Sequence, residues 1–111
     1  MKKGSLQYCV LAVIASRRRY GYEIVRVLSE NGLITYEGTI YPLLARLKRD
    51  GLVTAYWQES EKGAPRKYYE ITAQGREELR QFKQAWADYR RAVNRILERD
   101  EARDENPGSD N

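Results

Sequence analysis

The sequence has no histidine and only one cysteine, Cys9, among its 111 residues. A lone cysteine forms no internal disulfide, and without histidine the chain lacks the usual ligand sets for zinc. It also lacks paired catalytic carboxylates, a glycine-rich phosphate loop and any metal-binding motif. The sequence therefore predicts a protein that is not an enzyme and that has no catalytic residues, no metal site and no cofactor.

Long hydrophobic runs are also missing. The longest, "CVLAVIA", is far too short to span a bilayer. Together with the basic end before it, this run has some features of a secretory signal, but without it the rest of the chain would lack an apolar first helix to pack on. With 41% hydrophobic and 32% charged residues, the chain is typical of one small soluble unit. We expect a cytoplasmic protein with no membrane partner.

Acidic residues are scarce in most of the chain and concentrated at its end. The net charge is +4, but six acids and only two bases lie from residue 98 onward. Residues 1–97 therefore carry 18 bases and 10 acids, a net charge of +8. Such a basic body suits a polyanion such as nucleic acid, although ordinary solubilising charge is the alternative.

The spacing of apolar residues predicts three helices in the first half of the chain. The first covers residues 5–19 and is apolar on most of its circumference. The second covers residues 20–32 and ends at an Asn-Gly pair, and the third covers residues 37–51 and ends at Asp-Gly.

The second half begins with strand-like segments over 52–60 and 66–72, which flank the turn sequence "EKGAP". Thr72 is expected to cap a long helix that reaches about residue 98. Three helices, a two-stranded hairpin and a long helix are the order of a winged helix-turn-helix with a helical extension. The predicted fold class is mainly α with a β-hairpin.

This order divides the chain into three parts. Residues 1–72 are predicted to form the winged helix-turn-helix DNA-binding domain. Residues 73–99 are predicted to form a dimerisation helix. Residues 100–111 are charged, with a Pro-Gly pair and almost no apolar residue, and are predicted to be a disordered acidic tail.

The third helical segment starts with residues that favour helices poorly. Its apolar face is regular, but the sequence Gly-Thr-Ile-Tyr-Pro stands at its start. A recognition helix contacts DNA mainly through its N-terminal residues, where proline costs no internal hydrogen bond and glycine lets a backbone approach closely. A plain core helix would explain the apolar face but not this start. The predicted DNA-binding residues of this segment are Gly38, Thr39, Tyr41, Arg46 and Arg49.

The hairpin tip adds a second basic element. Lys62, Arg66 and Lys67 surround the tight turn of "EKGAPRKYY". A basic tip can neutralise phosphates along the DNA backbone or in the minor groove. The alternative is an ordinary hairpin with solubilising charges.

Three stretches of the sequence stand out together: "YGYEI", "EGTIYPLLARLKRDGLV" and "GAPRKYYEITAQGREEL". With them the chain resembles the PadR family of bacterial transcriptional regulators over about residues 5–98. This resemblance implies a dimeric winged-helix repressor that binds a palindromic operator. The single helix after the wing is similar to the smaller subfamily, which includes regulators of multidrug-export genes.

The resemblance also assigns residues. Gly38, Thr39 and Tyr41 match the start of the family's recognition helix, and Arg66 and Lys67 match the basic pair of its wing. This sequence has alanine at position 64, where many members have arginine. The wing is therefore expected to hold phosphate less strongly, unless the lysine at position 62 compensates.

The last helix carries an apolar seam at heptad spacing. Its members are Leu79, Phe82, Trp86, Tyr89, Val93 and Ile96. A small winged-helix domain cannot cover the whole seam, so a second copy of the chain is the simplest partner. The alternative is that the helix folds back along the first helix. We expect both contacts.

The middle of the seam is a predicted effector site. In drug-sensing small PadR proteins a tryptophan at this place flanks a pocket at the dimer centre, and Trp86 fits that spacing. With Tyr89 and Arg90 it is expected to bind a small planar hydrophobic effector. Alternatives are a ligand-independent repressor, in which Trp86 only packs, and a winged-helix module that binds proteins instead of DNA.

Overall fold

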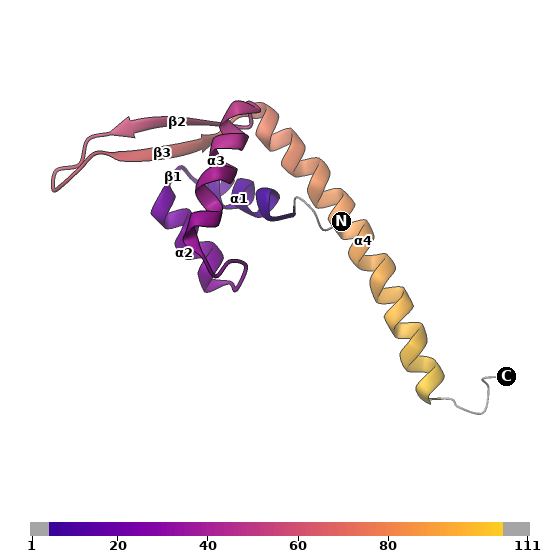
Figure 1. The fold of residues 1–111 in the computed structure, drawn as a ribbon. Coiled ribbons are helices and arrows are strands. Elements are labelled where there is room, and N and C mark those ends of the chain that lie inside the picture. Colours follow the sequence, from indigo (N-terminus) through magenta and orange to yellow (C-terminus); the bar gives the residue numbers. More distant parts are fainter. Residues whose placement is uncertain (1–4, 106–111) are drawn as a thin grey trace.

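Three helices form the body of the molecule. The computed structural model describes residues 5–105, with side chains described to residue 99. Helix α1 covers Ser5–Ser16, α2 covers Gly21–Glu30 and α3 covers Ile40–Arg49 (Figure 1). The three helices that the sequence predicts are confirmed.

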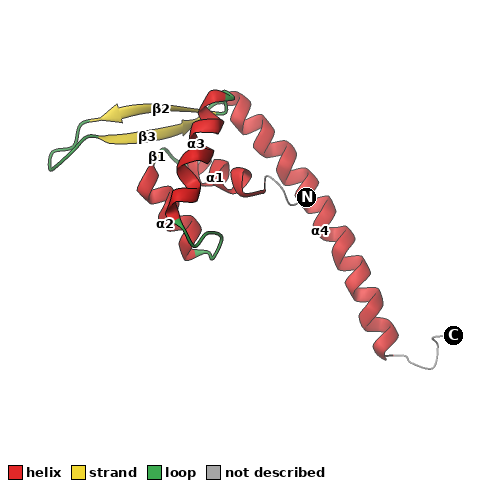
Figure 2. Cartoon of the chain, in the orientation of Figure 1, coloured by secondary structure: helices red, strands yellow, loops and turns green. Residues whose placement is uncertain are grey.

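The wing is a hairpin of strands β2 (Val53–Gln58) and β3 (Arg66–Ile71), which extends beyond the helices (Figure 2). A third strand, β1 (Arg19–Tyr20), pairs with β3, so the antiparallel sheet has the order β1-β3-β2. The sequence predicts only the hairpin. Strand β1 is too short for alternation to be read from it, and pairing with β3 alone defines it.

The core lies where the helices meet the inner ends of the strands. The predicted apolar face of α3, formed by Ile40, Leu43, Leu44 and Leu47, is buried. It packs in one cluster with Leu11 of α1 and its neighbours. The core thus fixes one side of α3 inward and leaves its other sides for contacts with partners.

The helix ends follow the predicted signals. Gly32 and Gly51 have φ of 74° and 78°, a backbone conformation that glycine adopts without strain. After α2, the Leu33 N–H donates to the Leu28 carbonyl at 2.9 Å, which closes the helix end. At the start of α4, the Gly75 N–H donates to the Thr72 hydroxyl oxygen at 3.0 Å, so the predicted cap is confirmed.

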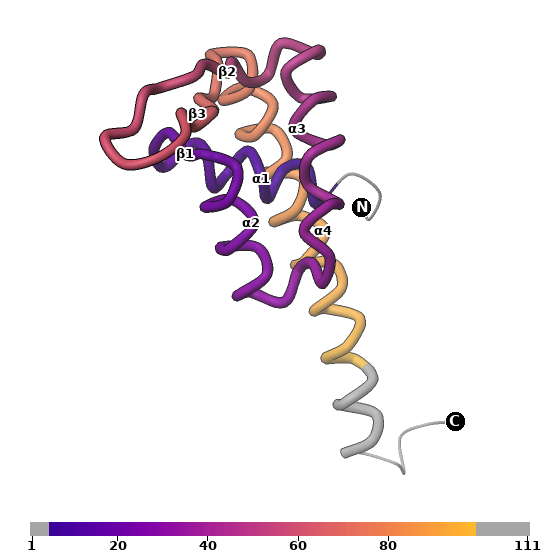
Figure 3. The backbone as a smooth tube through the Cα atoms, turned by 60° about the vertical axis from the view of Figure 1, so that its left-hand side comes forward, coloured from indigo at the N-terminus to yellow at the C-terminus, as the bar shows by residue number. Residues whose placement is uncertain are grey.

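Helix α4 (Ala73–Glu105) projects from this body, and the molecule measures 70 × 27 × 20 Å. In Figure 3 the orange part of α4 runs down past the other three helices. The helix continues six residues beyond the predicted boundary at residue 99, so the part of the predicted tail from 100 to 105 is helical. The rest of that tail, 106–111, lies outside the described residues.

Only the first part of the α4 seam packs on its own chain. Leu79 is buried, and the Phe82 ring stacks on Tyr8 of α1 with centroids 4.3 Å apart. The predicted contact between α4 and α1 is thus confirmed. Within residues 5–105, no helix is long and apolar enough to cross a membrane.

Candidate nucleic-acid interface

The predicted recognition helix begins later than its sequence suggests. A short 3-10 turn, Glu37–Thr39, precedes α3, so Gly38 and Thr39 lie before the α-helix. Pro42 falls in the first turn of α3, where backbone N–H groups have no partner within the helix. The poor helix formers therefore occupy a turn and a helix start.

Gly38 lies under a tyrosine ring. A Cβ atom at this position would come within 2.5 Å of the Tyr36 ring, which is itself exposed. A larger residue at 38 would push that ring aside. Thr39 is exposed next to it. The turn thus presents a compact backbone and a hydroxyl at the entrance to α3.

Two flanks of α3 carry different residues, and the predicted ones among them are Thr39, Tyr41 and Arg46. Tyr41, Ala45 and Lys48 lie on the flank that faces the wing, at spacings that put them on one side of a helix. Thr39 and Arg46 lie on the other flank, beside the start of α1. The predicted residues therefore divide into two groups.

Arg49 differs from the other predicted arginine of α3 because its guanidinium pairs with Asp50 at 3.7 Å. Both side chains are exposed, so this ion pair is weak and can open toward a phosphate. Arg46 makes no ion pair with a described carboxylate. Its charge is thus uncompensated within the described chain.

The basic residues of the wing are held by aromatic rings. Arg66 lies over the ring of Tyr20, 4.5 Å from its centroid, and the Lys67 ammonium lies 5.8 Å from that of Trp57. These cation–π contacts orient the cations without neutralising them. Lys62 lies at the exposed tip, away from both.

Three tyrosine rings from the three strands lie together on the sheet. Tyr68 stacks on Tyr56 and meets Tyr20 edge to face, with centroids 6.1 and 5.5 Å away. Arg18 lies over the Tyr68 ring and donates a 2.7 Å hydrogen bond to the Tyr56 hydroxyl, which raises the pKa of Arg18. This tyrosine layer (Tyr20, Tyr56 and Tyr68) ties the wing to the body.

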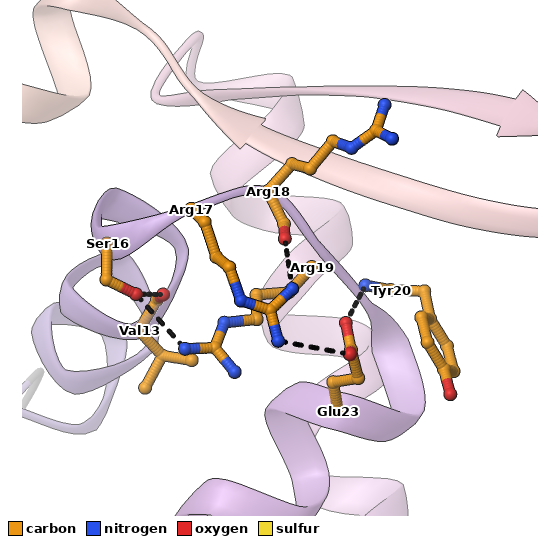
Figure 4. Close-up of polar contacts among 7 residues, drawn as sticks. All are labelled: Val13, Ser16, Arg17, Arg18, Arg19, Tyr20 and Glu23. Atoms are coloured by element: carbon orange, nitrogen blue, oxygen red, sulfur yellow. Dashed lines mark hydrogen bonds and ion pairs between the residues drawn. The ribbon is translucent and has the colours of Figure 1, made fainter.

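The arginine triplet before α2 has mostly structural contacts. In Figure 4, Arg17 turns toward Glu23, with which it pairs at 3.5 Å, and Arg19 donates to Ser16 at 3.1 Å. The Tyr20 N–H donates to the Glu23 carboxylate at 3.2 Å, which caps α2. Arg17 and Arg19 therefore stabilise the segment that connects α1 to α2.

A concavity of about 620 Å³ separates the wing-facing flank of α3 from the wing. Its walls hold four tyrosines, one tryptophan and three cations, and none of its lining residues is acidic. Tyr41, Arg66 and Lys67 were predicted as binding residues, while Tyr22 and Lys48 were not. Burial raises the pKa of Tyr69 in the inner wall, and neighbouring Tyr41 adds to the shift.

The predicted effector residues lie on the exposed part of α4. The Phe82, Trp86 and Tyr89 rings follow one another with centroid distances of 6.0 and 6.1 Å. Trp86 is 42% exposed, and Arg90 is exposed beside it. Leu97, 55% exposed, extends this surface and was missed because it lies off the strict heptad positions.

A three-helix body with a wing and a basic concavity beside its third helix defines the class: a winged helix-turn-helix of the kind that binds DNA. Residues 10–81 match the model of the transcriptional regulator PadR-like family. The chain belongs to this family of transcriptional regulators, which are not enzymes.

Solved structures agree with this assignment. A PadR-like transcriptional regulator from Bacillus cereus is 38% identical, with 86% of this chain and 93% of that chain covered and a TM-score of 0.75. A Streptococcus transcriptional regulator is 40% identical, with 86% and 94% covered and a TM-score of 0.78. Transcriptional regulator Rv3488 of Mycobacterium tuberculosis is 29% identical over 83% of this chain and 85% of its own.

Proposed function

We propose that the protein is a sequence-specific DNA-binding repressor that acts in the cytoplasm as a homodimer on a palindromic operator. The observation that carries this proposal is the basic concavity between α3 and the wing. Residues of both elements line it, and none of its lining residues is acidic. In this account Gly38, Thr39 and Tyr41 meet the DNA at the start of α3. Arg46 and Arg49 contact it along the helix.

The wing completes the binding surface. Lys62 at the tip, together with Arg66 and Lys67, neutralises phosphates beside the groove that α3 enters. The described part of the chain contains a DNA-binding unit and a helix but no further folded unit. Occupying an operator and so excluding other proteins is the simplest way for such a chain to regulate transcription.

The experiment is selection of binding sites from a random duplex library, followed by titration at several salt concentrations. We expect an inverted repeat and a steep fall of affinity with salt, because phosphate contacts release counterions. Equal affinity for all sequences would contradict sequence-specific regulation. No DNA binding at low salt would favour the alternative, a winged-helix module that binds proteins.

We propose that the exposed part of α4 forms the dimer contact. Trp86, Tyr89, Val93 and Ile96 are exposed at heptad spacing, and Ile96 is 60% exposed. A run of exposed apolar side chains along one helix is costly in water, and the same helix of a second copy covers it with matching spacing. Residues 1–72 then bind DNA, and residues 73–99 set the distance between the two copies.

A second candidate function is release by an effector. The observation that favours it is the ladder of the Phe82, Trp86 and Tyr89 rings on an exposed helix. Two such ladders facing each other across a two-fold axis would bind a flat hydrophobic molecule by stacking and burial of area. Arg90 beside the ladder disfavours cationic compounds. Without such a ligand, the protein would be a ligand-independent repressor.

A further inference from the structure

We infer that the junction between α3 and α4 is a rigid coupling that sets which half-site spacing two copies of the chain accept. The junction consists of Gly51, Leu52, Thr72 and Gly75. Thr72 is its central residue and a positioning residue, because it acts on DNA binding only by fixing the direction of α3 relative to α4. This inference rests on the proposed dimeric DNA-binding function and deepens it.

The inner end of the wing brings the two helices together. Strands β2 and β3 pair as far as Val53 and Ile71. Only residues 50–52 separate α3 from β2, and only Thr72 separates β3 from α4. The end of α3 and the start of α4 therefore meet at the same end of the sheet, as Figure 1 shows. Such short connections leave the two helix ends little freedom to move separately.

Thr72 joins these two ends by three hydrogen bonds. Its hydroxyl donates to the Gly51 carbonyl at 2.7 Å, two residues after the end of α3. The same oxygen accepts from the Gly75 N–H in the first turn of α4 at 3.0 Å. The backbone N–H of Thr72 donates to the Leu52 carbonyl at 3.0 Å. A helix cap needs only the bond to Gly75, so the other two bonds serve to tie α4 to the segment that follows α3.

Gly75 lets the two backbones touch. Glycine within a helix is less favourable than alanine, so its presence here calls for a reason. A Cβ atom at this buried position would lie 2.2 Å from the Leu52 carbonyl oxygen and 2.8 Å from a side-chain carbon of Ile71. The first turn of α4 thus rests directly on the segment after α3, with no side chain between them. A tilt of α4 therefore moves that segment as well.

The junction lies between the proposed dimer contact and the proposed recognition helix. After it, α4 stays on its own chain through Leu79 and the Phe82 ring, which stacks on Tyr8. From Trp86 onward the seam is exposed. A second copy bound there would orient α3 through the start of α4. Two half-sites are read together only when both recognition helices have the distance and direction that the DNA requires.

The test separates the Thr72 hydroxyl from the shape of its side chain. Thr72→Val removes the hydroxyl and keeps the branched shape, whereas Thr72→Ser keeps the hydroxyl. Because Thr72→Val also loses a cap, the buried Ile24 of α2 supplies a control, Ile24→Val, which lowers stability away from the junction. Fluorescence anisotropy measures affinity for the selected operator, for operators with longer or shorter half-site spacing, and for a single half-site.

We expect Thr72→Val to weaken binding to the selected operator about fivefold, the equivalent of one ordinary hydrogen bond, and to leave affinity for a single half-site unchanged. Operators with altered spacing should lose less affinity, so the preference for the selected spacing falls. Thr72→Ser and Ile24→Val should keep the wild-type preference.

Two results with Thr72→Val would overturn the coupling but not the proposed function. One is an unchanged preference for spacing, and the other is an equal loss on every duplex, the single half-site included. If the wild type itself shows no preference for spacing, the proposed dimeric function fails, and the inference fails with it.

The distance between the two copies of α3 gives a second test without DNA. A spin label is attached to the exposed position 48 of α3 by Lys48→Cys in a chain that carries Cys9→Ala, and double electron–electron resonance measures the distance between labels. We expect Thr72→Val to broaden the distribution of distances. Gly75→Ala should displace it, because the new methyl group does not fit beside Leu52. Distributions identical to that of the labelled parent chain in both variants would contradict the coupling.

Discussion

Tyr41 packs against its own chain and is also a proposed DNA contact. Its ring contacts α2, since a Cβ atom at Gly21 would lie 3.0 Å from ring atom Cε1. The residue is 46% exposed, so it is only partly packed. Replacing the whole residue would therefore mix loss of packing with loss of the hydroxyl.

Tyr41→Phe separates these two contributions. We expect operator affinity to fall about fivefold, the equivalent of one ordinary hydrogen bond, with the melting temperature unchanged. Tyr41→Ala should weaken binding further and also lower the melting temperature, because the contact with α2 is lost. Band-shift titration and thermal denaturation give both quantities. If Tyr41→Phe binds the operator with wild-type affinity, the Tyr41 hydroxyl does not contact the DNA.

Sequence patterns identify some residues of the proposed interface and miss others for a physical reason. The apolar face of α3 shows that Tyr41, Arg46 and Arg49 point away from the core. The same spacing could have identified Lys48, which is seven residues after Tyr41. Tyr22 could not be assigned in this way, since only the tertiary approach of α2 to the wing brings it to the concavity.

The wing depends on the tyrosine layer for its position. Tyr68 is the centre of this layer and contacts both Tyr20 on β1 and Tyr56 on β2. Because these ring contacts run across β1, β3 and β2, the layer links β1 to the hairpin through side chains as well as through strand pairing. A hairpin with fewer contacts to the body would present its basic tip less accurately.

Tyr68→Ala tests this role. We expect faster amide hydrogen exchange in β2 and β3 and weaker operator binding, because the wing loses its central ring contacts. Tyr68→Phe keeps the ring and is the matched control, which should behave as the wild type in both measurements. Unchanged exchange in Tyr68→Ala would show that pairing of the backbone alone holds the wing.

Helix α4 changes its environment along its length, and substitutions should follow this change. Leu79 is buried in its own chain, so Leu79→Ala should lower the free energy of unfolding by about 2–4 kcal/mol. The double variant Trp86→Glu, Val93→Glu should instead remain folded but become monomeric, because these side chains are exposed in the single chain. Denaturation measures the free energy of unfolding of Leu79→Ala. Size-exclusion with light scattering measures the oligomeric state of the double variant. A wild-type monomer at micromolar concentration would refute the dimer.

The elements were predictable where their patterns are long. The three body helices, the hairpin and the start of α4 follow from apolar spacing, the turn glycines and the Thr72 cap. Strand β1 is not predicted, because two residues are too few to show the alternation of apolar and polar side chains that is typical of a strand. The predicted end of α4 is too early because residues 100–105 lack an apolar pattern, although the Glu, Ala and Arg residues among them favour helix as single residues.

At the scale of the whole molecule, the projecting α4 would set the distance between two DNA-binding units. A planar compound inserted beside Trp86 would change that distance and weaken binding to two half-sites together. We expect planar dyes to quench Trp86 fluorescence and to lower operator affinity in the wild type but not in Trp86→Ala. Because coupling between two sites is reciprocal, bound operator should also weaken the binding of the dye to the protein. Quenching with operator affinity unchanged would contradict release by an effector.

The central claim is that two copies of α3 and the wing bind one operator together. Hydroxyl-radical footprinting of a selected duplex tests it most directly. We predict two protected regions related by inverted symmetry, with centres about one helical turn apart, or roughly 34–36 Å, and protection at the backbone between the grooves in each. A single protected region, or protection that is uniform along the duplex, would contradict the account.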